Sequence, residues 1–199
     1  NMSLWHRAVK LFVGLSEDKQ QDMADIIRFS DRALEIKPDA VSHAARAFVE
    51  ANIFKNCEKA LYHAGQLEPL ARSGQDYQFL GLAFTNCGEL TPGISALEKS
   101  LKMTPNDTDW TRTRSLLSLL HVAGRIDEIK DLMQGKLDAP DMNGYILLYF
   151  SYLEKSSGND VVAAEYYKKA TEAGFNLNEF KRTFQIDSNE DMVLQTLSC

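Results

Sequence analysis

The sequence has no apolar run near the roughly 20 residues that a membrane-spanning helix requires. Its most apolar stretch is "LLYF", residues 147–150, and the N-terminal region lacks the apolar segment of a secretory signal. The net charge is −6 and the basic residues form no long cluster, which argues against nucleic acid or an anionic membrane as the main partner. We therefore expect a cytoplasmic protein that binds neither nucleic acid nor membranes.

Cysteine is scarce. The three cysteines, Cys57, Cys87 and Cys199, are odd in number and widely spaced, and they match neither a zinc pattern nor a disulfide framework. We therefore expect Cys57 and Cys87 to be reduced, half-buried helix residues of a cytosolic-type protein.

Motifs typical of catalytic, metal-binding and phosphate-binding sites are also missing. The sequence contains no His-Glu-x-x-His, no glycine-rich phosphate loop and no Gly-x-Ser-x-Gly, and no two of its four histidines are spaced i, i+4. The acidic runs at 16–18, 127–131 and 189–191 are typical of helix starts, where the helix dipole attracts carboxylates. These absences predict a protein that is not an enzyme, with no catalytic residue, no cofactor and no metal site.

The sequence pattern indicates helices along the whole chain. Apolar residues recur at spacings of three and four, alternation typical of strands is hard to find, and the prolines lie where helices should begin or end. The pattern predicts an all-α chain with short connections, so that neighbouring helices pack antiparallel. The predicted helices are 4–15, 18–36, 40–54, 57–68, 76–87, 91–103, 108–123, 126–136, 142–155 and 160–173, with shorter ones near 178–185 and 189–197.

Pairs of these helices repeat along the chain. The phrases "ALEIKPDA" at 33–40 and "SLKMTPND" at 100–107 place Pro38 and Pro105 67 residues apart, one short of twice 34. The unit that ends at Pro105 carries Leu80-Gly81 and Phe84 on its first helix and Ile94, Leu97 and Leu101 on its second. This unit resembles the tetratricopeptide repeat, a helix pair of 34 residues that closes on a proline.

The resemblance implies a right-handed superhelical α-solenoid of about five antiparallel helix-pair repeats, because so small a hairpin cannot bury its apolar stripe alone. We expect one domain, 1–199, with repeats at 7–40, 41–73, 74–107, 110–143 and 144–177. Residues 178–199 are expected to form a capping helix or the start of a further repeat.

The chain departs from the family pattern at three places. Gly93 stands where the family usually has alanine, and Ser30 stands where it usually has an aromatic residue. The second repeat is one residue short and lacks the family's aromatic residues. We expect a local irregularity in superhelical twist around residues 55–72.

In this family the first helix of each repeat lines a concave groove that binds a partner. The resemblance implies groove positions in this chain that are occupied by amides, one arginine, one histidine and two tyrosines, with no acids among them. Such a surface suits a peptide, helix or partner domain with some negative charge. The predicted groove residues are Asn52, Gln75, Gln78, Asn86, Arg114, His121, Tyr145 and Tyr152.

The sequence thus predicts a protein–protein interaction scaffold, and two alternatives stay open. Because the chain ends abruptly at Cys199, it could be a regulatory or substrate-recruiting domain of a larger enzyme. An incompletely capped end could instead stack on another copy, which would make the chain a self-associating module and a homo-oligomer.

Overall fold

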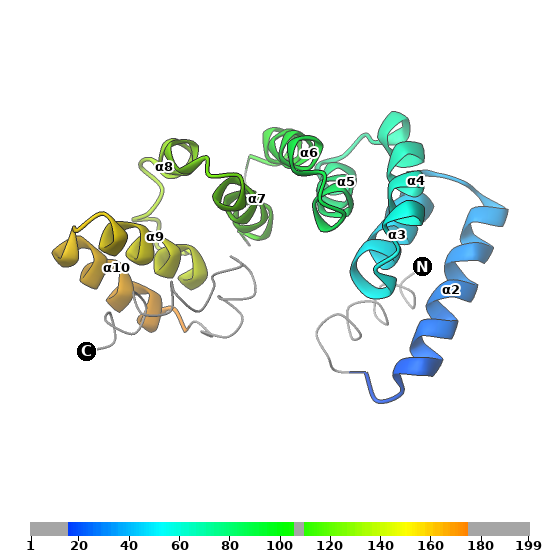
Figure 1. Cartoon of the computed structure of the whole chain (residues 1–199), viewed down its shortest axis with the longest axis horizontal. Helices are drawn as coiled ribbons and strands as arrows, with labels where there is room; N and C mark the ends of the chain where they lie inside the picture. The colour runs from blue at the N-terminus through cyan, green and yellow to red at the C-terminus, as the bar shows by residue number, and fades with distance from the viewer. Residues whose placement is uncertain (1–15, 106–109, 175–199) are drawn as a thin grey trace. The chain divides into compact units, whose positions relative to one another are not determined.

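The computed structural model describes residues 16–105 and 110–174, and the regular elements within these residues are all helices (Figure 1). No strand occurs in the described part of the chain, so the expected all-α class is confirmed. The predicted helices 4–15, 178–185 and 189–197, and with them the expected capping segment 178–199, lie outside the described residues.

The helices begin and end close to the predicted positions. The largest differences are the early end of the helix predicted at 126–136 and a π-helical turn that closes the helix predicted at 40–54. The elements are α2 (Lys19–Ile36), α3 (Ala40–Val49), the π-helix η1 (Glu50–Phe54), α4 (Cys57–Leu67), the 3₁₀ helix η2 (Glu68–Leu70), α5 (Gly74–Asn86), α6 (Leu90–Met103), α7 (Thr111–Val122), α8 (Ile126–Met133), α9 (Gly144–Ser156) and α10 (Asp160–Glu172).

Side-chain caps fix several of these helix starts. At α5 the Ser73 hydroxyl accepts a hydrogen bond from the Asp76 amide, and the Asp76 carboxylate accepts one from the Ser73 amide, which completes a capping box. The Asp39 side chain caps α3 by accepting a hydrogen bond from the Ser42 amide. The Asn56 side chain caps α4 in the same way and accepts from the Lys59 amide. Each bond satisfies a backbone N–H that has no partner inside its own helix.

The chain divides into two compact units, Asn1–Pro105 and Asn106–Cys199. The division falls two residues before the end of the third predicted repeat. The single-domain organisation and the solenoid geometry stay predictions, and the two units are described separately below.

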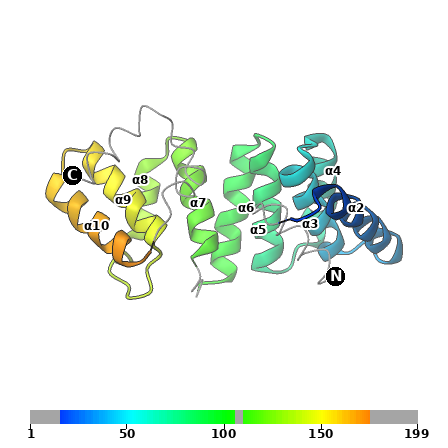
Figure 2. The same ribbon diagram turned by 90° about the horizontal axis from the view of Figure 1, so that it is seen from below.

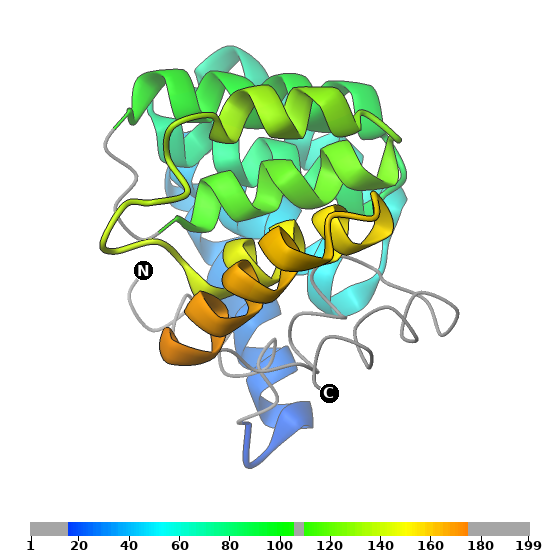
Figure 3. The same ribbon diagram turned by 90° about the vertical axis from the view of Figure 1, so that its left-hand side faces the viewer.

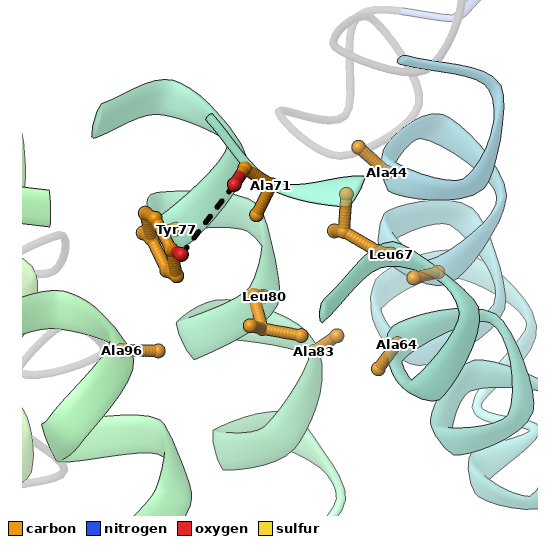
Figure 4. Close-up of a cluster of buried hydrophobic side chains, with 9 residues drawn as sticks. Ala44, Ala64, Leu67, Ala71, Tyr77, Leu80, Ala83 and Ala96 are labelled. Carbon is orange, nitrogen blue, oxygen red and sulfur yellow. Dashed lines mark hydrogen bonds between the residues drawn. The ribbon is translucent and has the colours of Figure 1, made fainter. Parts of the chain in front are cut away.

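In the first unit, α3 packs against α4 and α5 against α6, while α3 also contacts α2 and α5 (Figure 2). Small residues make these contacts close. Figure 4 shows the cluster where α3, α4, α5 and α6 meet. Its buried members are Ala44, Ala47, Ala64, Leu67, Ala71, Tyr77, Leu80, Ala83 and Ala96. With so many alanines the helix backbones approach closely, and Leu67 and Leu80 fill the remaining space.

Glycines bring α5 and α6 closest together. A Cβ atom at Gly93 would lie 2.5 Å from Thr85 Oγ1 and 3.2 Å from the Gly81 carbonyl oxygen. A Cβ atom at Gly81 would lie 2.7 Å from Leu97 Cγ. The glycine at position 93, where the tetratricopeptide pattern usually has alanine, is therefore explained by this tight contact with Gly81 and Thr85.

Two irregular turns lie before and within residues 55–72. The π-helix η1 ends at Lys55, which has a left-handed φ of 55°, and the 3₁₀ helix η2 contains Pro69. A π-turn inserts an extra residue into a helix and frequently accompanies a functional site. The irregularity in superhelical twist around residues 55–72 stays a prediction.

In the second unit, α7 contacts α8, and α9 lies side by side with α10 (Figure 3). Helix α9 is the core of this unit, because every residue from Ile146 to Leu153 is buried. The Ser151 hydroxyl, completely buried, donates to the Ala163 carbonyl oxygen of α10 at 2.7 Å. This bond satisfies a buried polar group inside an otherwise apolar helix contact.

Candidate functional site

Two predicted groove residues meet in the first unit. Asn86, at the end of α5, donates from Nδ2 to Asn52 Oδ1 on η1 at 3.0 Å, across 34 residues of sequence. Each amide is also fixed to its own helix, since Asn86 Nδ2 donates to the Leu82 carbonyl at 2.8 Å and Asn52 Nδ2 donates to the Phe48 carbonyl at 2.9 Å. The two side chains therefore form an oriented amide pair, of which Asn86 is exposed and Asn52 half-buried.

The amide pair keeps hydrogen-bonding capacity. Both Nδ2 hydrogens of Asn86 have partners, whereas its Oδ1 accepts no hydrogen bond from residues 16–105 or 110–174. An exposed carbonyl oxygen held in one direction can accept a hydrogen bond from a partner's backbone N–H.

The two predicted glutamines lie on α5, the helix that carries Asn86. Gln75 is exposed and Gln78 half-buried. Positions 75, 78, 82 and 86 are separated by three or four residues, so their side chains share one helix face. We name the set formed by Asn52, Gln75, Gln78 and Asn86 the amide stripe.

The predicted groove residues of the second unit form contacts between α7 and α9. The Arg114 guanidinium lies 5.2 Å from the centroid of the Tyr145 ring, a cation–π distance. His121 Nδ1 is 2.9 Å from Tyr149 Oη, and its ring meets the Tyr152 ring edge to face at 6.3 Å. We name Arg114, His121, Tyr145, Tyr149 and Tyr152 the aromatic cluster.

The aromatic cluster is less open than expected. Tyr152 is only 7% exposed and Tyr149 is completely buried, whereas Arg114, His121 and Tyr145 are half-buried. Tyr152 is thus held inside the fold, where it can support the cluster but offers little surface. Sequence reasoning missed Tyr149, although its place four residues after Tyr145 and three before Tyr152 puts it on the same face of α9.

A buried ionic network lies close to the amide stripe. Arg46, with 8% of its side chain exposed, donates to Glu50 Oε1 at 2.9 Å and to Ser30 Oγ at 2.6 Å. It also forms an ion pair with Asp31 of α2. Ser30, at a position where the tetratricopeptide pattern usually has an aromatic residue, is therefore a hydrogen-bond acceptor for a buried charge. The network joins α2 to α3 and η1, and the sequence analysis did not find it.

The prediction that Cys57 and Cys87 are reduced is wrong. Cys57, the first residue of α4, and Cys87, which follows α5, form a disulfide with their Cα atoms 5.2 Å apart. Both residues are half-buried, as expected. The packing of α4 on α5 brings the start of one helix to the end of the other, and counting cysteines cannot show this. The disulfide adjoins the amide stripe, because Cys87 directly follows Asn86.

A cavity of about 340 Å³ lies in the second unit, between α9, α10 and the segment that precedes α9. Lys169 and Asp138, both among its lining residues, form an ion pair at 2.8 Å. No predicted groove residue lines the cavity. Its lining residues are Leu137, Asp138, Ala139, Pro140, Met142, Leu147, Lys169, Glu172 and Ala173.

No group of three or more histidine, cysteine, aspartate or glutamate side chains in residues 16–105 and 110–174 is placed to hold a metal ion. Over the same ranges, none of the helices has the length and apolarity that crossing a bilayer requires.

No protein-family model matches the chain, and a search of the curated proteins finds no match. The tetratricopeptide resemblance therefore rests on the repeat pattern in the sequence.

Proposed function

We propose that this chain is a non-catalytic interaction scaffold of the tetratricopeptide type that holds a partner segment along the amide stripe. The observation that carries the proposal is the hydrogen bond from Asn86 to Asn52. This bond joins the predicted repeats 41–73 and 74–107 across 34 residues of sequence, and its two amides lie one position apart in repeat register because the second repeat is one residue short.

The chemistry of the amide stripe suits an extended peptide. An amide side chain offers both a donor and an acceptor, so it can bond the backbone of a partner whatever the partner's side chains are. Asn86 and Asn52 are already fixed by bonds to their own helices. Their rotamers are therefore selected before binding, and less side-chain entropy is lost when a partner is bound.

The aromatic cluster supports a partner with some negative charge. Arg114 is half-buried, and its guanidinium lies 5.2 Å from the centroid of the Tyr145 ring. A positioned arginine binds carboxylates through two parallel hydrogen bonds. No side chain in the amide stripe is charged, so nothing in that set would repel an acidic segment.

The test is a screen of the full chain against an array of extended peptides, neutral and acidic, followed by fluorescence anisotropy with the peptides retained. The double variant Asn52→Ala/Asn86→Ala should weaken binding about tenfold or more, the loss expected for one or two hydrogen bonds in a desolvated interface. The control is Gln66→Ala, an exposed amide on α4 that lies outside the amide stripe. Equal affinities for the wild type, the double variant and the control would overturn the proposal.

A further inference from the structure

Two histidines form a contact that the proposed function does not use. His43 on α3 and His63 on α4 are 20 residues apart, and their Nδ1 atoms are separated by 3.1 Å. The ring centroids are 5.4 Å apart with the planes tilted by 40°. His43 is buried, with 8% exposed, and His63 is half-buried. The pair thus bridges the two helices of the second predicted repeat.

The contact requires that at least one ring be neutral. A hydrogen bond between two Nδ1 atoms needs one protonated donor and one acceptor with a free lone pair. A first added proton leaves an imidazolium that still donates to the neutral ring. A second proton removes the acceptor and places two positive charges 3.1 Å apart.

The surroundings of the pair disfavour the protonation of even one ring. Burial lowers the pKa of His43, although the nearby Asp39 carboxylate favours its charged form. Burial lowers the pKa of His63 to about 4, and the positive charges on His43, Arg46 and Lys59 act in the same direction. Asp31 of α2 opposes this shift and is outweighed. The Tyr62 ring, 5.1 Å from the His63 ring, adds no charge.

We infer that the His43–His63 contact is an acid-sensitive latch, which holds α3 against α4 at neutral pH and releases the pair on acidification. The inference does not depend on the proposed function, because it concerns how two helices stay together and not what they bind.

The direction of the effect follows from proton linkage. Above pH 6.5, the ordinary pKa of histidine, the closed and opened forms both hold neutral rings and the latch is intact. As the pH falls from 6.5 toward 4, the opened form takes up protons that the closed form resists, so opening becomes more favourable. Asp39 stays ionised across this window, because the hydrogen bond from the Ser42 backbone lowers its pKa.

Amide hydrogen exchange of the full chain, measured between pH 7.5 and 4.5 in the presence of a chelator, tests the inference. Protection of α3 and α4, corrected for the intrinsic exchange rate, should fall between pH 6.5 and 4.5. Linkage sets an upper limit of about tenfold per pH unit for one proton, and a half-buried ring should show at least about fivefold over the window. The chelator removes metal ions that two histidine nitrogens could bind.

The variant His63→Asn keeps a polar group near Nδ1 and cannot titrate, so the fall in protection of α3 and α4 should become smaller than in the wild type, leaving only the part that comes from His43. The matched control is His121→Asn in the second unit, which should leave the acid response of α3 and α4 unchanged. Parallel profiles for the wild type and His63→Asn would overturn the inference.

A measurement on the wild type alone covers the case in which His63→Asn does not fold. Histidine Cε1–H resonances followed by NMR should show one ring of the pair with a midpoint below pH 5. Midpoints near 6.5 for every histidine would overturn the inference.

Discussion

Asn86 donates a hydrogen bond to Asn52 across 34 residues of sequence, and the residue after Asn86 is joined by a disulfide to α4. The amide pair is therefore held by a covalent link between α4 and α5 as well as by its own bonds to the Leu82 and Phe48 carbonyls. Such a pair changes little when a partner binds, which is the property expected of a pre-formed recognition surface.

Single substitutions should separate the binding and folding roles of this pair. We expect Asn86→Ala to lower the free energy of unfolding by only about 0.5–1 kcal/mol, because Asn86 is exposed and water replaces its two bonds. Its effect on peptide affinity should be larger, because the bound partner excludes that water. Urea denaturation and fluorescence anisotropy measured on the same preparations would compare the two losses. A larger loss in stability than in binding would show that the pair is structural.

The contact between α5 and α6 predicts that an added methyl group at Gly93 is harmful. In Gly93→Ala the new Cβ would displace the Thr85 hydroxyl, which donates to the Gly81 carbonyl at 2.6 Å. Overpacking of this kind costs about 1–3 kcal/mol and should outweigh the better helix propensity of alanine, about 1 kcal/mol. We expect a net loss of about 1 kcal/mol in the free energy of unfolding, measured by urea denaturation.

Gly65 on α4 is the matched control for Gly93. A Cβ atom there would meet nothing within 4 Å, so Gly65→Ala should raise the free energy of unfolding by about 0.5–1 kcal/mol through helix propensity alone. In the Gly93→Ala background, Thr85→Ala should recover part of the loss by removing the atoms that clash. If both glycine variants were stabilised equally, the close approach of α5 and α6 would be contradicted.

Removing Arg46 alone should lower the free energy of unfolding strongly, whereas replacing both Arg46 and Glu50 by apolar residues should lower it little. Arg46→Met leaves Glu50, whose side chain is 4% exposed, buried without its cation, and such a loss costs about 3–5 kcal/mol. The double variant Arg46→Met/Glu50→Leu removes both charges and should recover most of that stability. Thermal and urea unfolding of the two variants give the comparison. Equal stability of the single and double variants would argue against a buried, coupled pair.

The helices could be predicted because their signals are local. The apolar spacing of three and four fixes which face is buried, and Asp39, Asn56 and Ser73 mark helix starts through bonds to amides three residues ahead. The repeat pattern places Asn52 and Asn86 among the groove residues, but it does not predict the hydrogen bond between them, because the short second repeat leaves the two residues one position apart in register.

The features that were missed depend on which helix faces meet. Nothing in the spacing of Cys57 and Cys87 shows that the start of α4 adjoins the end of α5. Arg46 lies one turn before Glu50, a pair that is common on solvent-exposed helix faces, and only the packing of α2 over α3 makes it buried. Tyr152 was expected on an open surface for the same reason, since its burial comes from the packed fold and not from its own helix.

The disulfide predicts a thiol count and a sensitivity to reductant. Of the three cysteines, Cys57 and Cys87 are paired, so at most one thiol per native chain should react with a thiol reagent, and three should react after reduction and unfolding. Closing a loop of 30 residues stabilises a fold by about 2–4 kcal/mol, so reduction should lower the midpoint of thermal unfolding. The double variant Cys57→Ser/Cys87→Ser should unfold at the same temperature with and without reductant. Three reactive thiols in the untreated, folded chain would contradict the disulfide.

The aromatic cluster predicts how binding should respond to charge. Reversing the charge in Arg114→Glu should weaken an acidic peptide more than a neutral one of equal length, because only the acidic peptide meets a like charge. Tyr145→Ala removes the ring that holds the guanidinium and should weaken both peptides through lost contact area, and the double variant Arg114→Glu/Tyr145→Ala should lose the most. Lys130→Glu, an exposed lysine on α8 outside the cluster, makes the same charge change and serves as control.

Anisotropy titrations at two salt concentrations would resolve the charge effect, since added salt should reduce the difference between Arg114→Glu and wild type. Unchanged affinity in the double variant would move the binding site away from the aromatic cluster, while the test at Asn52 and Asn86 would still decide the role of the amide stripe.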